Sequence, residues 1–460
     1  MMAAMPRAPP AALLLATALA AVLVLAQAQA EKLVAVGSFL YAGGLPASHI
    51  AEWDGSAWTT ANGGVHTLGD GSAYTAVDAV AVLGNNKVVA AGAFNQADGV
   101  SAANTAQWDG QAWSALGAGV DGPVYGLVTY AAAGTTYVAV QGAFQAAGGA
   151  PADGLAQWDG TAWSALPATV NGAISTSVQH SVDGGASFRL YVGGSFTQIG
   201  AVNASGLAQW DGAAWAAVGG GVSASSGYRL VAALTLDGAD LYVGGQFSKD
   251  IDGAVTLNIA VYHTDTDAWS PLGAGMGTFG SVYALLVHNG DLYVGGIFDA
   301  AGGVAAANVA KWDGRAWTAL GAGVGGADSG GVLSLAVFRN AVVAAGSFAT
   351  AGGAPANNIA QWDGTAWAAL GGGIGTAEGG GADGSNTVYG LAVYTPAAVA
   401  TPPPPFNRWD AWAITVAVIV LVFALIGVVA TGMFIYRKVR RSGDGDDDEK
   451  KPLNLSVQYP

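Results

Sequence analysis

The chain has 460 residues, of which 71 are glycine and 52% are hydrophobic, while only 10% are charged and none is cysteine. Globular chains contain roughly 7% glycine and about 25% charged residues, so this composition excludes an ordinary helical enzyme and a highly charged disordered chain. The lack of cysteine excludes disulfides and thiol chemistry, and a net charge of −15 argues against a nucleic-acid partner.

Residues 1–30 are typical of a secretory signal peptide. Arg7 precedes an apolar run, and the small residues Ala28 and Ala30 offer a cleavage site before Glu31. We therefore expect the mature chain to begin at Glu31.

Residues 31–396 contain a repeat about 50 residues long, present seven times. Six copies carry Trp-Asp-Gly, the remaining copy is degenerate at Tyr262, and a second tryptophan follows in every copy. The six Trp-Asp pairs are Trp53 and Asp54, Trp108 and Asp109, Trp158 and Asp159, Trp210 and Asp211, Trp312 and Asp313, and Trp362 and Asp363.

Each repeat predicts four short strands. In the sixth copy these are 282–287, 292–298, 308–312 and a strand around Trp317, with a tight Asp-Gly turn between the last two. The second strand is apolar or glycine on both faces, as expected when a sheet is covered on both sides. Glycine pairs such as those at 193–194, 244–245 and 295–296 would let neighbouring sheets approach closely. The pattern predicts an all-β fold, a seven-bladed β-propeller.

The two ends of the repeat region predict that the propeller closes. The region opens on a second strand, 33–39, and ends on a first strand, 388–394. If the last strand completes the first blade, all seven blades have four strands and no sheet edge stays open. In an open β-solenoid, the alternative, the strand missing at the start of the region would not have to be present at its end.

The repeats resemble those of kelch proteins. The fifth copy shows this best, because Tyr262 and Trp269 stand where kelch units have Y-D-x-x-T-x-x-W. The other copies, with A-G-G…N-x-A-x-W-D-G-x-x-W-x-x-L-G, look more like the ectodomain repeats of the fungal bud-site cortical marker family. That resemblance implies a type I membrane protein with propeller-like repeats.

The aspartates of Trp-Asp-Gly are expected to be turn residues, because copies one blade apart cannot converge on one ion. The five histidines fall at unrelated repeat positions, so each is expected to be solitary and no metal or cofactor is predicted. We therefore expect no catalytic residue. The five are His49, His66, His180, His263 and His288.

Two features bear on the surface of the predicted propeller. Asn203 begins the sequon Asn-Ala-Ser in a loop, which predicts N-glycosylation. The connections 59–76 and 368–387 are long, and by ring closure they flank the same blade. Long loops on a rigid scaffold often bind ligands, so we expect ligand binding in this region. Glycine-rich filler around the closing blade would explain the two long connections equally well.

The C-terminal part of the sequence predicts that the protein is anchored in a membrane. A proline-rich stalk, 397–410, leads into the uncharged segment 411–436, which as a helix would span ~36 Å or more, enough for a bilayer. Basic residues begin the tail 437–460 and predict that it is cytoplasmic. Ser442 in this tail is a candidate phosphorylation site, and Gly427 with Thr431 hints at weak helix-mediated dimerisation.

Together these features predict a single-pass type I protein of the plasma membrane. Its propeller would be a non-catalytic binding or adhesion module for extracellular protein or glycan ligands. Two alternatives remain: a cortical or polarity marker that acts through its tail, and, less favoured, a membrane-tethered glycan-active enzyme.

Overall fold

The computed structural model describes residues 31–67, 75–132, 134–166, 169–182, 187–224, 228–277, 280–326, 330–375 and 386–396. The chain divides into two units, Met1–Ala398 and Val399–Pro460. The predicted signal peptide, stalk, membrane helix and cytoplasmic tail all lie outside the described residues. No helix that could cross a membrane is found in the part of the chain that is described. That part contains strands and no helix, which confirms the all-β prediction.

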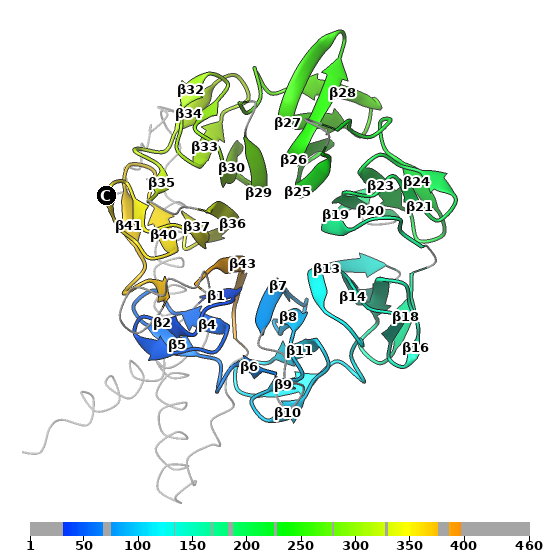
Figure 1. Cartoon of the computed structure of the whole chain (residues 1–460), viewed down its shortest axis with the longest axis vertical. Helices are drawn as coiled ribbons and strands as arrows, with labels where there is room; N and C mark the ends of the chain where they lie inside the picture. The colour runs from blue at the N-terminus through cyan, green and yellow to red at the C-terminus, as the bar shows by residue number, and fades with distance from the viewer. Residues whose placement is uncertain are drawn as a thin grey trace, which may run out of the picture. The chain divides into compact units, whose positions relative to one another are not determined.

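The main strands form seven four-stranded antiparallel sheets, numbered here sheet 1 to sheet 7 (Figure 1). Sheet 1 consists of β43 (Val388–Tyr394), β1 (Lys32–Gly37), β4 (Ile50–Trp53) and β5 (Trp58–Thr60). Sheet 2 consists of β7 (Ala76–Val82), β8 (Val88–Ala93), β11 (Thr105–Trp108) and β12 (Trp113–Ala115). Sheet 3 consists of β13 (Val124–Ala132), β14 (Thr135–Gly142), β17 (Leu155–Trp158) and β18 (Trp163–Ala165). Sheet 4 consists of β19 (Ile174–Val182), β20 (Ser187–Gly194), β23 (Leu207–Trp210) and β24 (Trp215–Ala217).

The last three sheets follow the same order, from the innermost strand to the outermost. Sheet 5 consists of β25 (Leu230–Asp237), β26 (Asp240–Ile251), β27 (Ala254–His263) and β28 (Ala268–Pro271). Sheet 6 consists of β29 (Ser281–His288), β30 (Asp291–Ile297), β33 (Val309–Trp312) and β34 (Trp317–Ala319). Sheet 7 consists of β36 (Gly331–Phe338), β37 (Ala341–Ser347), β40 (Ile359–Trp362) and β41 (Trp367–Ala369).

The seven sheets follow one another around a common axis, and the ring closes (Figure 1). Each innermost strand contacts the innermost strand of the next sheet, from β7 through β13, β19, β25, β29 and β36 to β43, which contacts β7. Strand β43 pairs with β1 from Lys32 opposite Tyr394 to Gly37 opposite Val388. The last strand of the repeat region therefore completes the first sheet, as its two ends predicted.

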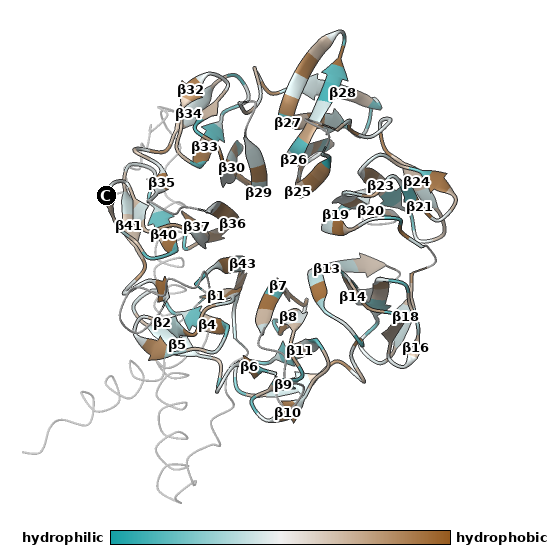
Figure 2. Ribbon diagram, viewed as in Figure 1, coloured by the Kyte–Doolittle hydropathy of each residue, from teal (hydrophilic) through white to brown (hydrophobic). Residues whose placement is uncertain are grey.

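Hydrophobic residues occur in strands all around the ring rather than on one side of it (Figure 2). Seven clusters of buried residues each span two neighbouring sheets. The cluster across the closure packs Leu33 and Phe39 of sheet 1 with Phe338 and Ile359 of sheet 7. Burial on both faces explains why the second strands are almost continuously apolar.

The repeated tryptophans connect each sheet to the one before it. Within a sheet the two rings lie side by side across the hairpin, with centroids 5.2–5.6 Å apart. In six sheets the second aromatic, always a tryptophan, donates its indole N–H to a backbone oxygen of the preceding sheet at 2.7–3.0 Å. At the closure, Trp58 donates to Leu370 O. The repeat thus supplies packing within a sheet and a polar bond between sheets.

The connections from second to third strands form small hairpins that meet the connection from the preceding sheet. These joints pair two or three short segments, and they place both kinds of connection on one face of the ring, as expected for a propeller. The short strands are β2 (Tyr41–Ala42), β3 (Leu45–Pro46), β6 (Val65–His66), β9 (Gln96–Ala97), β10 (Val100–Ser101), β15 (Ala146–Ala147), β16 (Ala150–Pro151), β21 (Gln198–Ile199), β22 (Val202–Asn203), β31 (Ala300–Ala301), β32 (Val304–Ala305), β35 (Val324–Gly325), β38 (Thr350–Ala351), β39 (Ala354–Pro355) and β42 (Ile374–Gly375).

Candidate ligand site at the Tyr125 grooves

Every innermost strand carries a β-bulge at the same place, close to its first residue. In β13, for example, Val124 pairs with Gly142 and Gly126 with Gln141, so Tyr125 is left without an opposite residue. A bulge changes the direction in which one side chain points and often lies beside a functional site. The seven bulge residues are Tyr389, Asp78, Tyr125, Ser175, Ala232, Tyr283 and Leu333 in sheets 1 to 7.

Glycine opposite the bulge is required by a close backbone approach. A Cβ atom on Gly142 would lie 2.1 Å from the Pro123 carbonyl oxygen. The first glycine of a pair has a different role, because a Cβ on Gly193 would lie 2.4 Å from Cγ1 of Val231 in the next sheet. The first glycine of each pair therefore allows neighbouring sheets to approach closely, as expected. The second glycine makes room for the backbone at the bulge of its own sheet. The glycines opposite the seven bulges are Gly37, Gly92, Gly142, Gly194, Gly245, Gly296 and Gly346.

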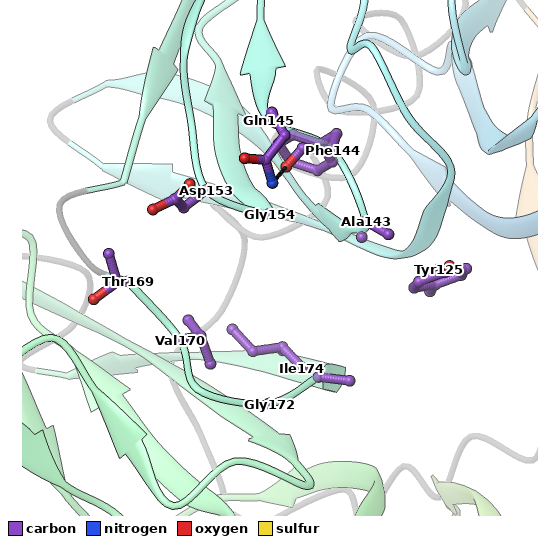
Figure 3. A pocket seen from close by; sticks show the side chains of 12 residues that line it. Tyr125, Ala143, Phe144, Gln145, Asp153, Gly154, Thr169, Val170, Gly172 and Ile174 are labelled. Atoms are coloured by element: carbon purple, nitrogen blue, oxygen red, sulfur yellow. Dashed lines mark hydrogen bonds between the residues drawn. The ribbon is translucent and has the colours of Figure 1, made fainter.

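Two grooves lie on either side of sheet 3 and share the side chain of Tyr125, which is 52% exposed. The groove between sheets 2 and 3 has a volume of about 600 Å³. The groove between sheets 3 and 4 has a volume of about 440 Å³ (Figure 3). We call them the Tyr125 grooves. They open on the face that carries the connections between second and third strands.

The walls of the first groove are held by a carboxylate that bridges two sheets. The Asp121 Oδ1 atom accepts hydrogen bonds from the backbone N–H groups of Gln145 and Ala146, both at 2.8 Å. These backbone bonds lower the pKa of Asp121. In the next joint Asn171 does the same for Thr197 and Gln198, again at 2.8 Å. Both short connections are therefore fixed in place.

One repeat position is asparagine in sheet 2 but glycine in sheet 3, and this difference helps to explain the groove between sheets 3 and 4. Asn104 has a positive φ of 60°, accepts a bond from Phe94 N–H and donates to Val120 O at 2.8 Å. In sheet 3 the corresponding residue is Gly154, with a φ of 68° and no side chain. Gly154 lines the groove between sheets 3 and 4, so the missing amide leaves space there.

The grooves are acidic. Asp78 and Asp121 line the first, Asp153 lines the second, and neither is lined by lysine or arginine. Burial raises the pKa of Asp78 to about 6, because a charged carboxylate loses hydration there. Asp121 and the Asn104 amide already bind the backbone, which leaves Asp78, Asp153 and Tyr125 as the groups best placed to meet a ligand. Figure 3 shows Asp153 and Thr169 on opposite sides of the second groove.

The predicted turn aspartates lie elsewhere, in the hairpins between third and fourth strands. In each of the six, one carboxylate oxygen accepts backbone N–H bonds from the residues two and three positions later, at 2.7–2.9 Å. These bonds lower the pKa of each carboxyl. Their contacts are those of turn residues, and the structure does not bring them together.

The structure corrects the view of the histidines. His263 is not solitary, because its ring contacts Asp240 and Ser270 in sheet 5. His49 is buried, and burial together with nearby His66 lowers its pKa to about 4. No group of three or more potential metal ligands occurs among the described residues.

The remaining predicted surface features are only partly described. Asn203 is exposed at the end of β22. The long connections include 68–74 and 376–385, which lie outside the described residues, as does Ser442. A small cavity of about 60 Å³ lies beside Asn386 and Ile374. Of the larger grooves, the one between sheets 2 and 3 is lined by Thr67 of the long connection 59–76, whereas the one between sheets 3 and 4 lies at short connections, which loop length did not indicate.

No protein-family model matches this chain, and no curated protein matches it. Among solved structures, the extracellular domain of a one-component system from B. thetaiotaomicron aligns with 72% of this chain and 38% of its own, at 12% identity and a TM-score of 0.42. The extracellular domain of a hybrid two-component system from the same organism aligns with 62% and 33%, at 13% identity and a TM-score of 0.36.

A third structure, YjhT, aligns over 63% of this chain and 95% of its own, at 13% identity and a TM-score of 0.35. The chain spans well under half the length of the two extracellular sensor domains. All three are below a TM-score of 0.5, and these similarities do not identify what this chain binds.

Proposed function

We propose that this protein is a type I cell-surface protein whose ectodomain is a seven-bladed, kelch-like β-propeller, and that the grooves around Tyr125 bind a protein or glycan without catalysis at that site. The pair of grooves around Tyr125 supports the binding role, since they offer about 440 and 600 Å³ on either side of one exposed aromatic ring. The uncharged segment 411–436 and the basic residues after it support anchoring in the plasma membrane.

The lining of the grooves suggests the charge of the ligand. Three aspartates and no basic side chain surround the exposed ring of Tyr125, on a chain with a net charge of −15. An anionic ligand would meet repulsion with no compensating cation. The ring offers a face for a sugar or a cationic group. The ligand is therefore a neutral or basic surface of a protein or glycan.

Binding can be tested with the full-length protein in detergent micelles. The probes are an array of neutral and acidic oligosaccharides and a panel of basic and acidic peptides. We expect neutral or basic probes to bind, and we expect Tyr125→Ala to weaken binding at least tenfold.

Tyr283→Ala is the matched control. Tyr283 occupies the same bulge position in sheet 6 but lines neither of the Tyr125 grooves. Equal losses in the two variants, or binding confined to acidic probes, would contradict the proposal.

A further inference from the structure

Sheet 5 differs from the six other sheets at one hairpin. Where they carry Trp-Asp, sheet 5 carries Tyr262 and His263, and its turn is two residues longer. The turn aspartates of the other sheets accept hydrogen bonds within their own turn, whereas the ring of His263 contacts side chains on β26 and β28. A departure confined to one copy of a regular repeat requires a local explanation.

The register of the strands places three polar groups together. Asp240 on β26 lies directly opposite His263 on β27, and the next strand, β28, carries Ser270 opposite Val261. The His263 Nδ1 atom lies 2.6 Å from Asp240 Oδ1, and the Nε2 atom lies 2.9 Å from Ser270 Oγ. One imidazole therefore joins a carboxylate to a hydroxyl.

The chemistry of the groups determines the direction of both bonds. A carboxylate can only accept, so His263 Nδ1–H donates to Asp240. In the neutral imidazole, Nε2 then carries the lone pair and accepts the hydroxyl proton of Ser270. This is the arrangement in which a histidine acts as a general base toward a serine, with the carboxylate holding its tautomer.

The surroundings keep this group ordered and accessible. The backbone N–H and the hydroxyl of Thr264, next to His263, both donate to Ala239 O at 2.9 Å, beside Asp240. The side chains of His263 and Asp240 are 29% and 41% exposed, and Ser270 is half-buried on the edge strand. The histidine and the carboxylate are therefore partly open to solvent.

We propose that Ser270 is a nucleophile activated by His263, and that sheet 5 carries an acyl-transfer site for neutral or cationic esters. The inference goes beyond ligand binding at the Tyr125 grooves, which open on the face of the second-to-third connections. The preference for neutral or cationic esters follows from two exposed acidic residues, Asp237, which lies opposite Asp240, and Asp265, two positions after His263.

The reaction balances with water as the second substrate. Ser270 Oγ bonds to the carbonyl carbon of the ester while its proton moves to His263 Nε2. The bond from that carbon to the leaving oxygen breaks, and the alcohol takes the proton. Water then attacks the acyl-serine and gives its proton to Nε2, which returns it to Ser270 Oγ as the acid leaves. Asp240 is a positioning residue.

The test uses a tagged fluorophosphonate on the full-length protein in detergent micelles. The serine oxygen bonds to phosphorus, fluoride leaves, and the adduct is located by peptide mass. We expect an adduct on Ser270 that disappears in Ser270→Ala, and a rate at least about 100-fold lower in His263→Gln. We also expect hydrolysis of 4-nitrophenyl acetate above background, lost in the same two variants.

Sheet 2 provides an internal control in the same molecule. Ser114 has the same register as Ser270, but its hydroxyl accepts a hydrogen bond from the side-chain amide of Gln107 at 3.0 Å. An amide cannot act as a base toward this hydroxyl. Ser114 should stay unlabelled. An unmodified Ser270, equal labelling of the two serines, or an unchanged rate in folded His263→Gln would overturn the proposal.

A second measurement follows the rate of labelling against pH, first in the wild type and then in variants of Asp240. In the wild type, labelling should fall at acid pH, because a protonated imidazole cannot accept a proton. Asp240→Asn should slow labelling at least about tenfold and change this pH profile, with partial recovery in Asp240→Glu. A flat wild-type profile would remove His263 as the base, and an unchanged profile in Asp240→Asn would remove the positioning role.

Discussion

The carboxylate of Glu52 accepts a hydrogen bond from the hydroxyl of Tyr394, although 342 residues separate them in the chain. Glu52 is only 2% exposed, and it also accepts bonds from Lys32 at 2.7 Å and from Trp108 Nε1 at 2.8 Å. Three strands of sheet 1 and one strand of sheet 2 therefore meet at a single buried charge. This group ties the two ends of the repeat region together.

The first prediction concerns this closure. Glu52→Ala leaves the ammonium of Lys32 and two buried donors without their acceptor, so the free energy of unfolding should fall by about 3–5 kcal/mol. Denaturant unfolding followed by tryptophan fluorescence measures it. Gln361→Ala, at the same register in sheet 7, should cost about 0.5 kcal/mol or less. Similar losses in both variants would mean that closure does not depend on Glu52.

The second prediction concerns the glycines opposite the bulges. Gly142→Ala would place a methyl group 2.1 Å from a carbonyl oxygen, which should destabilise the fold by about 3 kcal/mol or more. Gly149→Ala is the matched control, since its φ is 82° and nothing lies within 4 Å of its Cβ. Strain alone should cost about 1 kcal/mol there. Equal melting temperatures of the two variants would argue against the close approach.

The third prediction concerns pH and Asp78. Its folded pKa is raised to about 6 by burial, whereas the unfolded carboxyl titrates near 3.9. The folded state therefore holds the proton longer, and stability should fall as the pH rises from about 4 to about 6. Asp78→Asn should stabilise the protein by about 1–3 kcal/mol at pH 7.5 and leave it unchanged at pH 3. Unfolding curves at the two pH values measure this, and a loss at pH 7.5 would be the contrary result.

The fourth prediction concerns the exposed turn aspartates, whose pKa shift has the opposite sign. Backbone N–H bonds lower the pKa of Asp159, so its stabilisation is present above the unfolded value and is lost as the pH falls through the folded value. Asp159→Ala should remove that share of the acid sensitivity. Asp159→Asn keeps an acceptor oxygen without the charge, so it should retain the turn and lose the pH dependence. Melting temperatures between pH 2 and pH 7 distinguish the three proteins.

The fifth prediction concerns the glycan. When the protein is expressed through a eukaryotic secretory pathway, we expect a glycan on Asn203, which is exposed. Asn203→Gln should therefore remove the mobility shift that a glycosidase produces. Asn454→Gln, in a sequon of the predicted cytoplasmic tail, should change nothing. A glycosidase shift lost only in Asn454→Gln would reverse the expected topology.

The local features of this chain could be predicted from its sequence. The Asp-Gly turns and the alternation of strands depend on neighbouring residues, so they are visible within one copy, and comparison of the copies gives the period of about 50 residues. The unmatched strands at 33–39 and 388–394 even indicated how the ring closes, and their pairing is confirmed.

Other features could not be predicted because they depend on register and on contacts between sheets. The bulge at Tyr125 requires knowing that Gly142 pairs with Val124 rather than with its neighbour. The groove between sheets 3 and 4 depends on which side chain is missing at Gly154, and it lies at short connections that loop length did not indicate.

The sequence by itself determined the number of sheets, the strands within them and the strand that completes the first, since each follows from local turns and from counting. Only the tertiary structure decided that Glu52 meets Tyr394 and that His263 lies between Asp240 and Ser270. Such meetings depend on how strands align across a sheet and on the closing of the ring, and neither is written in the spacing of residues along the chain.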